Sequence, residues 1–226
     1  MNHRRKATIG WAVIALCIAV PRAEVKGQED PGADASRRGV ELAKKRDYTG
    51  AAAEFTKAIK ASPKTGRHYA NRGKAYRAAG KFAEAEADFA KLIELEPESA
   101  DAYSESGKAK VSEKKYDDAL ADLNKALELN AGDIDTLRFR AFAYLSKNDF
   151  DKAIADYTDV LEKMPKDVEA HRRRGYAYFS KGEKEKATAD FQAVLKIKPA
   201  DEDATNRLKA IQGKAAAPAV SPTPGH

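Results

Sequence analysis

The chain holds little of what builds disulfide scaffolds, metal centres or membrane spans. Its 226 residues include one cysteine, Cys17, and four histidines, which excludes an internal disulfide and a cysteine-rich zinc site. The longest largely apolar run, from Ala7 to Val20, is 14 residues, whereas a membrane-spanning helix needs about 20. The sequence also has no glycine-rich phosphate loop, no His-Glu-x-x-His motif and no Gly-x-Ser-x-Gly elbow.

The three histidines that follow residue 27 do not suggest a metal site. His68, His171 and His226 each lack a second ligand at helical spacing, and we expect His171 to fill space between helices. The many carboxylates show no pairing that marks an acid–base site. These observations predict a chain without enzyme activity, metal or cofactor; an enzyme with a site of an unrecognised kind is the alternative.

The net charge of +6 does not indicate a nucleic-acid partner. Of the 41 basic residues, four lie in residues 1–23, where no acidic residue occurs, which leaves 37 basic and 35 acidic residues in 24–226. Binding to phosphate backbones requires a concentrated basic surface, which this balance does not supply. We therefore expect no nucleic-acid partner.

Residues 1–27 have the layout of an export signal. Arg4, Arg5 and Lys6 precede the apolar run, as the charged region of a signal peptide precedes its hydrophobic region. We predict removal of this segment and export of the chain to the periplasm or the medium. The alternative is an uncleaved membrane anchor, with the rest of the chain facing away from the cytoplasm and organising envelope proteins. A membrane partner is expected only in that case.

Two further segments stand outside the regular part of the chain. Residues 28–31 are a short polar lead-in, and residues 214–226 form a Pro/Ala tail with too little apolar bulk to fold, which we expect to be disordered. Cys17 follows Leu16, where lipid-attachment sites carry a small residue, so we do not expect lipidation.

A strict 34-residue period runs through the rest of the chain. It divides the sequence into repeat 1 (32–65), repeat 2 (66–99), repeat 3 (100–133), repeat 4 (134–167) and repeat 5 (168–201), without an insertion or deletion. Position 8 of a repeat is small, position 20 is alanine and position 24 is large and apolar. In repeat order these residues are Gly39, Gly73, Gly107, Ala141 and Gly175; Ala51, Ala85, Ala119, Ala153 and Ala187; and Phe55, Phe89, Leu123, Tyr157 and Phe191.

The spacing predicts two antiparallel helices in each repeat. Positions 4, 8 and 11 share one helical face, as do positions 17, 20, 24, 27 and 28, and the small residues let the two helices approach closely. Position 15 is Gly80, Asn148 or Gly182 in three repeats, which suits a left-handed helix end. Position 34 is always a good N-cap for the next helix: Thr65, Ser99, Asp133, Asp167 and Asp201.

Over residues 32–201 this pattern resembles the tetratricopeptide repeat family. The resemblance implies an all-α fold, in which antiparallel helix pairs stack into a right-handed superhelix, or solenoid. We expect residues 202–213 to form a capping helix that closes the stack. Three residues depart from the motif and are expected to weaken individual interfaces: Lys110 at position 11, Lys184 at position 17, and Ala131 in place of the proline at position 32.

In this family the first helices line a concave groove, with positions 2, 5, 6, 9, 12 and 13 facing into it. The C-terminal half of that groove would combine guanidinium groups and rings, which suits a protein or peptide partner with carboxylates and apolar side chains. The alternative is that these arginines pair with Asp135, Glu169 and Asp203, and that the rings pack between helices. The candidate groove residues are Arg138, Phe139, Phe142, Arg172, Arg173, Tyr176, Phe179, Asn206 and Arg207.

The function that we predict is therefore a non-enzymatic, exported module for protein–protein interaction. The sequence does not define its oligomeric state.

Overall fold

The computed structural model describes residues 30–213, which contain eleven α-helices and no strand. The expected signal at 1–27, the first two lead-in residues and the tail at 214–226 lie outside the described residues. The helices are α1 (Ala33–Lys44), α2 (Tyr48–Ala61), α3 (Gly66–Ala78), α4 (Phe82–Leu95), α5 (Ala100–Ser112), α6 (Tyr116–Leu129), α7 (Ile134–Ser146), α8 (Phe150–Lys163), α9 (Val168–Ser180), α10 (Lys184–Ile197) and α11 (Glu202–Ile211).

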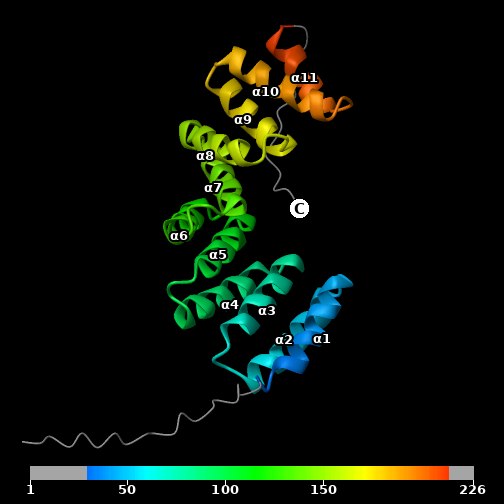
Figure 1. The fold of residues 1–226 in the computed structure, drawn as a ribbon, viewed down its shortest axis with the longest axis vertical. Coiled ribbons are helices and arrows are strands. Elements are labelled where there is room, and N and C mark those ends of the chain that lie inside the picture. Colours follow the sequence, from blue (N-terminus) through cyan, green and yellow to red (C-terminus); the bar gives the residue numbers. More distant parts are fainter. Residues whose placement is uncertain (1–29, 214–226) are drawn as a thin grey trace, which may run out of the picture.

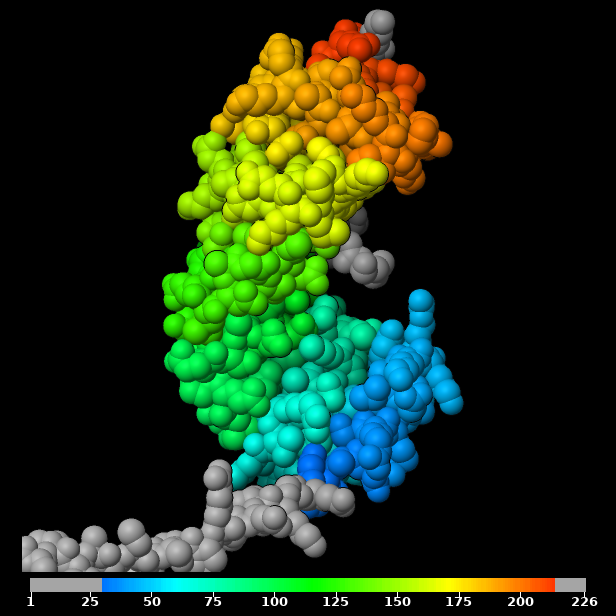
Figure 2. Space-filling view, viewed as in Figure 1, coloured from blue at the N-terminus to red at the C-terminus, as the bar shows by residue number. Residues whose placement is uncertain are grey.

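The helices stack in chain order into a curved solenoid, which opens like a letter C between its two ends (Figures 1 and 2). Each helix packs against its neighbours in sequence, and α11 packs on α10. In the described chain, contacts between every second helix join the odd-numbered helices α1 to α9. These helices are therefore closest together and line the concave side, while the even-numbered helices lie outside. The predicted helix pairs and capping helix are present.

In each repeat one large side chain at position 24 packs against the small residue at position 8, and in four of the five repeats it is an aromatic ring. The position-20 alanines are fully buried, and the position-24 side chains are at most 2 % exposed. A Cβ atom added to Gly39 or Gly73 would lie 2.7 or 2.8 Å from the ring of Phe55 or Phe89 in the same repeat, which is closer than real contacts allow. The small residue at position 8 is thus required by the ring, as the sequence pattern indicates.

A buried ion pair also recurs between positions 7 and 23. In repeat 4, Arg140 donates from Nε and Nη2 to the two carboxylate oxygens of Asp156, at 2.8 and 2.7 Å. Its Nη1 donates to Asn124 of repeat 3 at 3.0 Å. One guanidinium therefore joins the two helices of its own repeat and reaches back to the repeat before. Two further repeats have this arrangement, through Arg72 with Asp88 and Thr56, and Arg174 with Asp190 and Thr158.

These arginines are further constrained by their surroundings. Each guanidinium carbon lies about 6 Å from the ring of the tyrosine at position 11, which is Tyr144 in repeat 4. Hydrogen bonds from Arg140 to Asp156 outweigh burial and raise the pKa of the arginine. Burial raises the pKa of the Asp156 carboxyl, and the hydrogen bonds from Arg140 oppose this effect.

In repeat 3 different residues pair with the aspartate at position 23. Position 7 is Ser106, whose hydroxyl donates to Asp122 at 2.5 Å, and Lys110 reaches the same carboxylate at 2.7 Å. The lysine that departs from the family motif thus supplies the charge that the serine lacks. No position-7 guanidinium reaches back from repeat 3 to repeat 2. Glu105 of repeat 3 instead contacts Arg77 at 3.2 Å and Lys74 at 3.8 Å across that junction.

The turns within repeats are more uniform than the sequence indicates. All five residues at position 15 adopt positive φ, including Arg46 and Lys114, whose φ angles are 62° and 63°. These two side chains give no local reason for a left-handed residue, so the helix packing imposes it.

The N-caps follow the prediction with one exception. Ser99, Asp133, Asp167 and Asp201 each accept a hydrogen bond from the first turn of the next helix. Thr65 makes no such bond at the start of α3. Extended backbone at this position is therefore kept even where the side chain does not cap.

Substitution of a position-7 arginine tests how strongly a buried carboxylate without its partner destabilises the fold. We expect Arg140→Met to lower the free energy of unfolding by about 3–5 kcal/mol, because it leaves the Asp156 carboxylate buried without its partner. The double variant Arg140→Met/Asp156→Leu should recover most of this loss. Urea denaturation followed by circular dichroism measures both.

Arg37→Met is the matched control, since its arginine side chain is 77 % exposed and pairs with Asp34 on the same helix. It should cost less than about 1 kcal/mol. Equal costs for the two single variants would show that the buried pair contributes nothing specific.

Candidate functional site

The predicted groove residues lie on the odd-numbered helices and α11, at the C-terminal end of the concave side. Seven of the nine remain at least partly exposed; Phe142 and Arg207 are buried, at 6 % and 8 % exposed. Phe142 meets the ring of Tyr116 edge-on, with centroids 6.3 Å apart. These two residues therefore support the groove from below and do not form its open surface.

Two arginines at position 5 share one arrangement. Arg138 on α7 and Arg172 on α9 each pair with the acidic residue three positions earlier and with the aspartate that caps the following helix. For Arg172 these are Glu169 and Asp201, the latter at 2.7 Å. For Arg138 they are Asp135, at 3.2 Å, and Asp167. The ion pairs that the sequence left as an alternative to ligand binding are formed.

The two carboxylates of each arginine differ in exposure. The capping aspartates Asp167 and Asp201 are 8 % and 3 % exposed in their side chains, whereas Asp135 and Glu169 are 64 % and 46 % exposed. Each of the two guanidinium groups therefore pairs with one buried carboxylate and one exposed carboxylate.

A second set of contacts connects position 9 of one repeat to position 6 of the next. The Arg173 guanidinium lies 4.5 Å from the ring centroid of Phe142, and that of Arg207 lies 5.3 Å from Tyr176. Towards the N-terminus the order of charge and ring reverses, since Lys108 lies 5.8 Å from the Phe139 ring. Each junction from repeat 3 to α11 therefore has one contact between a cation and a ring. Arg173 also pairs with Glu169 at 2.6 Å.

One aspartate links the groove to the capping helix. Asp201 accepts from the backbone N–H of Ala204 at 3.0 Å and pairs with Arg172 and Lys198. Burial of the Asp201 carboxyl opposes its ionisation, but the Ala204 amide and Arg172 outweigh this effect and lower its pKa.

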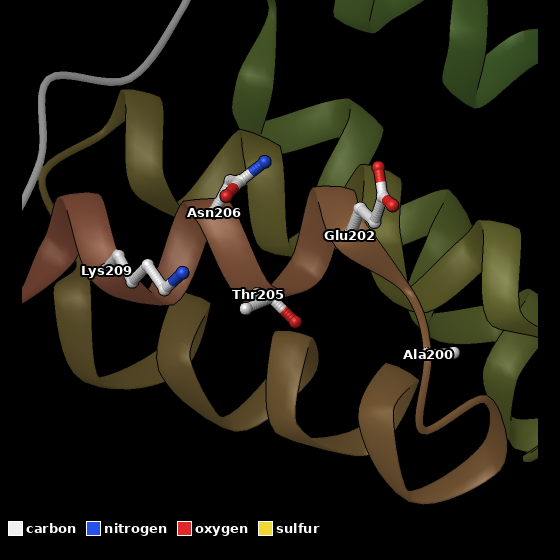
Figure 3. Close-up of a pocket in the computed structure, with 5 residues that line it drawn as sticks. All are labelled: Ala200, Glu202, Thr205, Asn206 and Lys209. Atoms are coloured by element: carbon white, nitrogen blue, oxygen red, sulfur yellow. The ribbon is translucent and has the colours of Figure 1, made fainter.

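The last two predicted residues lie where the solenoid ends. Phe179 packs partly against the cluster of Phe191, Val194 and Ala204. Asn206 is exposed and lines an open hollow of about 430 Å³ on α11, together with Glu202, Thr205 and others (Figure 3). In that view Asn206 and Glu202 point away from the helix on one side while Thr205 points to the other, so these groups do not converge on one point.

Charge is separated between the two sides of the solenoid, which the whole-chain total hides. The five inner helices α1, α3, α5, α7 and α9 carry 14 basic and 6 acidic residues. The five outer helices α2, α4, α6, α8 and α10 carry 9 basic and 15 acidic residues. Summing charge by predicted helix would have found this separation from the sequence.

Between residues 30 and 213, no helix is both long and apolar enough to cross a membrane. Over the same residues, no three His, Cys, Asp or Glu side chains are grouped so that they could hold a metal ion.

Comparison with known proteins identifies the family. A tetratricopeptide repeat model matches residues 36–85, 70–134 and 140–202, which together cover more than half of the chain. The chain therefore belongs to the tetratricopeptide repeat family. A search of curated proteins finds no match.

Solved structures show the same right-handed superhelix of helix pairs. A crystal structure of MamA is 28 % identical, with a TM-score of 0.66, and the match covers 71 % of this chain and 94 % of that one. YrrB, described as having an unusual peptide-binding site, is 22 % identical (TM-score 0.67; 82 % and 94 % covered). PilW, a type IV pilus biogenesis factor, is 17 % identical (TM-score 0.73; 81 % and 87 % covered). The last two support the fold alone.

Substitution of the capping aspartate Asp201 tests how much it contributes to stability at the C-terminal end of the groove. We expect Asp201→Asn to destabilise the protein by about 1–2 kcal/mol near neutral pH, since it weakens both the N-cap of α11 and the pair with Arg172. Because the folded pKa of Asp201 is lowered, its contribution is present above the unfolded pKa of about 3.9 and is lost as the pH falls through the folded value. Urea denaturation at a series of pH values measures this.

The variant and the original chain should therefore converge in stability in acid. Hydrogen exchange should show faster opening of α11 in the variant at neutral pH. A constant difference at all pH values would mean that the Asp201 charge has no role.

Proposed function

We propose that the protein is a non-enzymatic binding module whose concave groove takes an acidic, partly apolar segment of another polypeptide. The observation that carries this proposal is the excess of basic residues on the inner helices, combined with rings on α7 and α9. Protein binding in general follows from the family; the groove, the acidic ligand and the residues are the proposal.

The ion pairs of the groove favour exchange with a ligand. Exposed pairs such as Arg138 with Asp135 contribute little to stability, so a ligand carboxylate can replace the exposed partner at low cost. The buried partners Asp167 and Asp201 stay in place and fix the guanidinium groups before binding. This preorganisation lowers the entropy that binding must overcome.

The rings add apolar contact beside these charges. Phe139, Tyr176 and Phe179 are partly exposed, and aromatic side chains together with arginine are frequent among residues that dominate binding energy. A ligand with acidic and apolar residues in alternation would meet both kinds of group along α7 and α9.

Substitution of the position-5 arginines tests the groove. We expect Arg138→Gln/Arg172→Gln to weaken binding of a fluorescein-labelled peptide of alternating glutamate and leucine by about tenfold or more, because two charge-assisted contacts are lost. Fluorescence anisotropy measures the dissociation constant. The same peptide with glutamine in place of glutamate should bind weakly to both proteins.

The control is Lys125→Gln/Lys163→Gln, which removes the same charge from the outer helices α6 and α8. It should leave the affinity unchanged. If both double variants lose affinity equally, the peptide responds to net charge, and the groove is not its site.

We further propose that the protein is exported. The support is the basic segment at Arg4–Lys6 followed by the apolar run from Ala7 to Val20. In the alternative, the segment stays as an anchor, and the solenoid organises proteins at the outer face of the membrane.

Export predicts a shorter mature chain. N-terminal sequencing of the protein from cell fractions should show that Trp11 is lost and that the processed chain lies outside the cytoplasm. Recovery of Trp11 in a membrane fraction would support the anchor, and recovery in the cytoplasm would contradict both.

A further inference from the structure

A small hollow of about 190 Å³ lies between repeats 1 and 2, away from the concave groove. It is bounded by the first turns of α2 and the end of α3, and its lining includes Tyr48, Ala52, Tyr76, Ala79 and Lys81. The position is the edge of the solenoid where the turns within repeats occur. Two rings, three alanines, two threonines and one cation therefore surround a space that side chains do not fill.

The other junctions of the same solenoid show what normally fills this place. Ala52 stands at position 21, which is Leu120 in repeat 3 and Ile154 in repeat 4. Leu120 packs beside Tyr116 against a buried cluster, and Ile154 packs beside Phe150 in the same way. A larger side chain at Ala52 would grow into the hollow, so the first junction lacks an aliphatic group that two others have.

The mouth of the hollow is open for a related reason. At the last two junctions between repeats, a lysine at position 14 pairs with an aspartate at position 18 of the preceding repeat, as Lys147 does with Asp117 and Lys181 with Asp151. At the first junction these two positions are Ala79 and Thr49. No ion pair therefore covers the opening.

Lys81 indicates that the group missing from this junction would carry a negative charge. It stands at position 16, where Lys115 holds the carboxylate of Glu86 at 2.8 Å across the next junction. Glu86 is at position 21, the place of Ala52. Within residues 30–213 Lys81 has no carboxylate partner, and its ammonium lies 5.9 Å from the Tyr76 ring. The cation is thus present, while a counter-charge like the one that Glu86 gives Lys115 is absent.

We propose that this hollow is a second interaction site, which takes a leucine- or isoleucine-sized side chain next to a carboxylate from a partner polypeptide. The partner would supply from outside the aliphatic group of Leu120 or Ile154 and the charge of Glu86. Tyr48 and Tyr76 contact the aliphatic part, and Lys81 pairs with the carboxylate. The site does not depend on the concave groove, so either proposal can fail alone.

The experiment uses the full isotope-labelled chain and three small probes followed by nuclear magnetic resonance. N-acetylleucine should shift the amide signals of residues 48–53 and 76–81 with saturation in the millimolar range. N-acetylalanine, which lacks the branched group, should bind about tenfold more weakly. The amide of N-acetylleucine, which lacks the carboxylate, should also bind more weakly, and Lys81→Gln should reduce the acid to the level of the amide.

Two variants close the hollow with residues that this chain already uses elsewhere. Ala52→Leu copies repeat 3 and fills the space, and Thr49→Asp/Ala79→Lys copies the Asp117–Lys147 pair and covers the mouth. Both should keep the helical content and abolish the response to N-acetylleucine. The arginine variants of the concave groove should respond as the original chain does.

Three results would overturn the proposal. The first is an unchanged response in Ala52→Leu, and the second is a response confined to α7 and α9. The third is a shift of the same signals with protein concentration and no probe, which would assign the hollow to a second copy of this chain.

Discussion

The contact on which the solenoid most depends is a guanidinium held between two helices and shared with the repeat before. Arg72, Arg140 and Arg174 each form a bidentate pair with an aspartate on the second helix of their own repeat and donate a third hydrogen bond backwards. A buried charge tolerates little displacement once it is paired, so these contacts fix the distance and the rotation between neighbouring helices. The apolar residues supply the driving force for stacking, and the arginines restrict its geometry.

The same arrangement separates the two sides of the molecule electrostatically. Position 7 is arginine in every repeat except repeat 3, and position 23 is an acidic residue in all five repeats. The surface residues extend this difference, so that the inner helices together are basic and the outer helices together are acidic. An anionic ligand that approaches the solenoid would therefore be guided to the concave side, an effect that the near-neutral total charge conceals.

The architecture could be predicted from the sequence because the same residue pattern recurs in all five repeats. Small residues at position 8 and large apolar residues at position 24 define the core, and their spacing fixes both helices. The position-7 pairs were missed because charges on helix faces are usually solvated. Their signal was nevertheless present, since an acid follows 16 residues after Arg38, Arg72, Arg140 and Arg174. The state of the groove could not be predicted, because Arg172 meets Asp201 only when successive repeats curve towards each other. The hollow beside Ala52 likewise requires residues from two repeats.

The exchange of arginine for Ser106 and Lys110 in repeat 3 has a consequence for how the solenoid comes apart. Repeats 2 and 3 are joined without a guanidinium from position 7. The pairs that take its place, through Glu105 and Glu86, are partly open to water. Dissolved ions screen such pairs more than buried ones. In a linear stack whose stability is the sum of neighbouring interfaces, this seam would loosen first as ionic strength rises, dividing the molecule into a short N-terminal block and a longer C-terminal one.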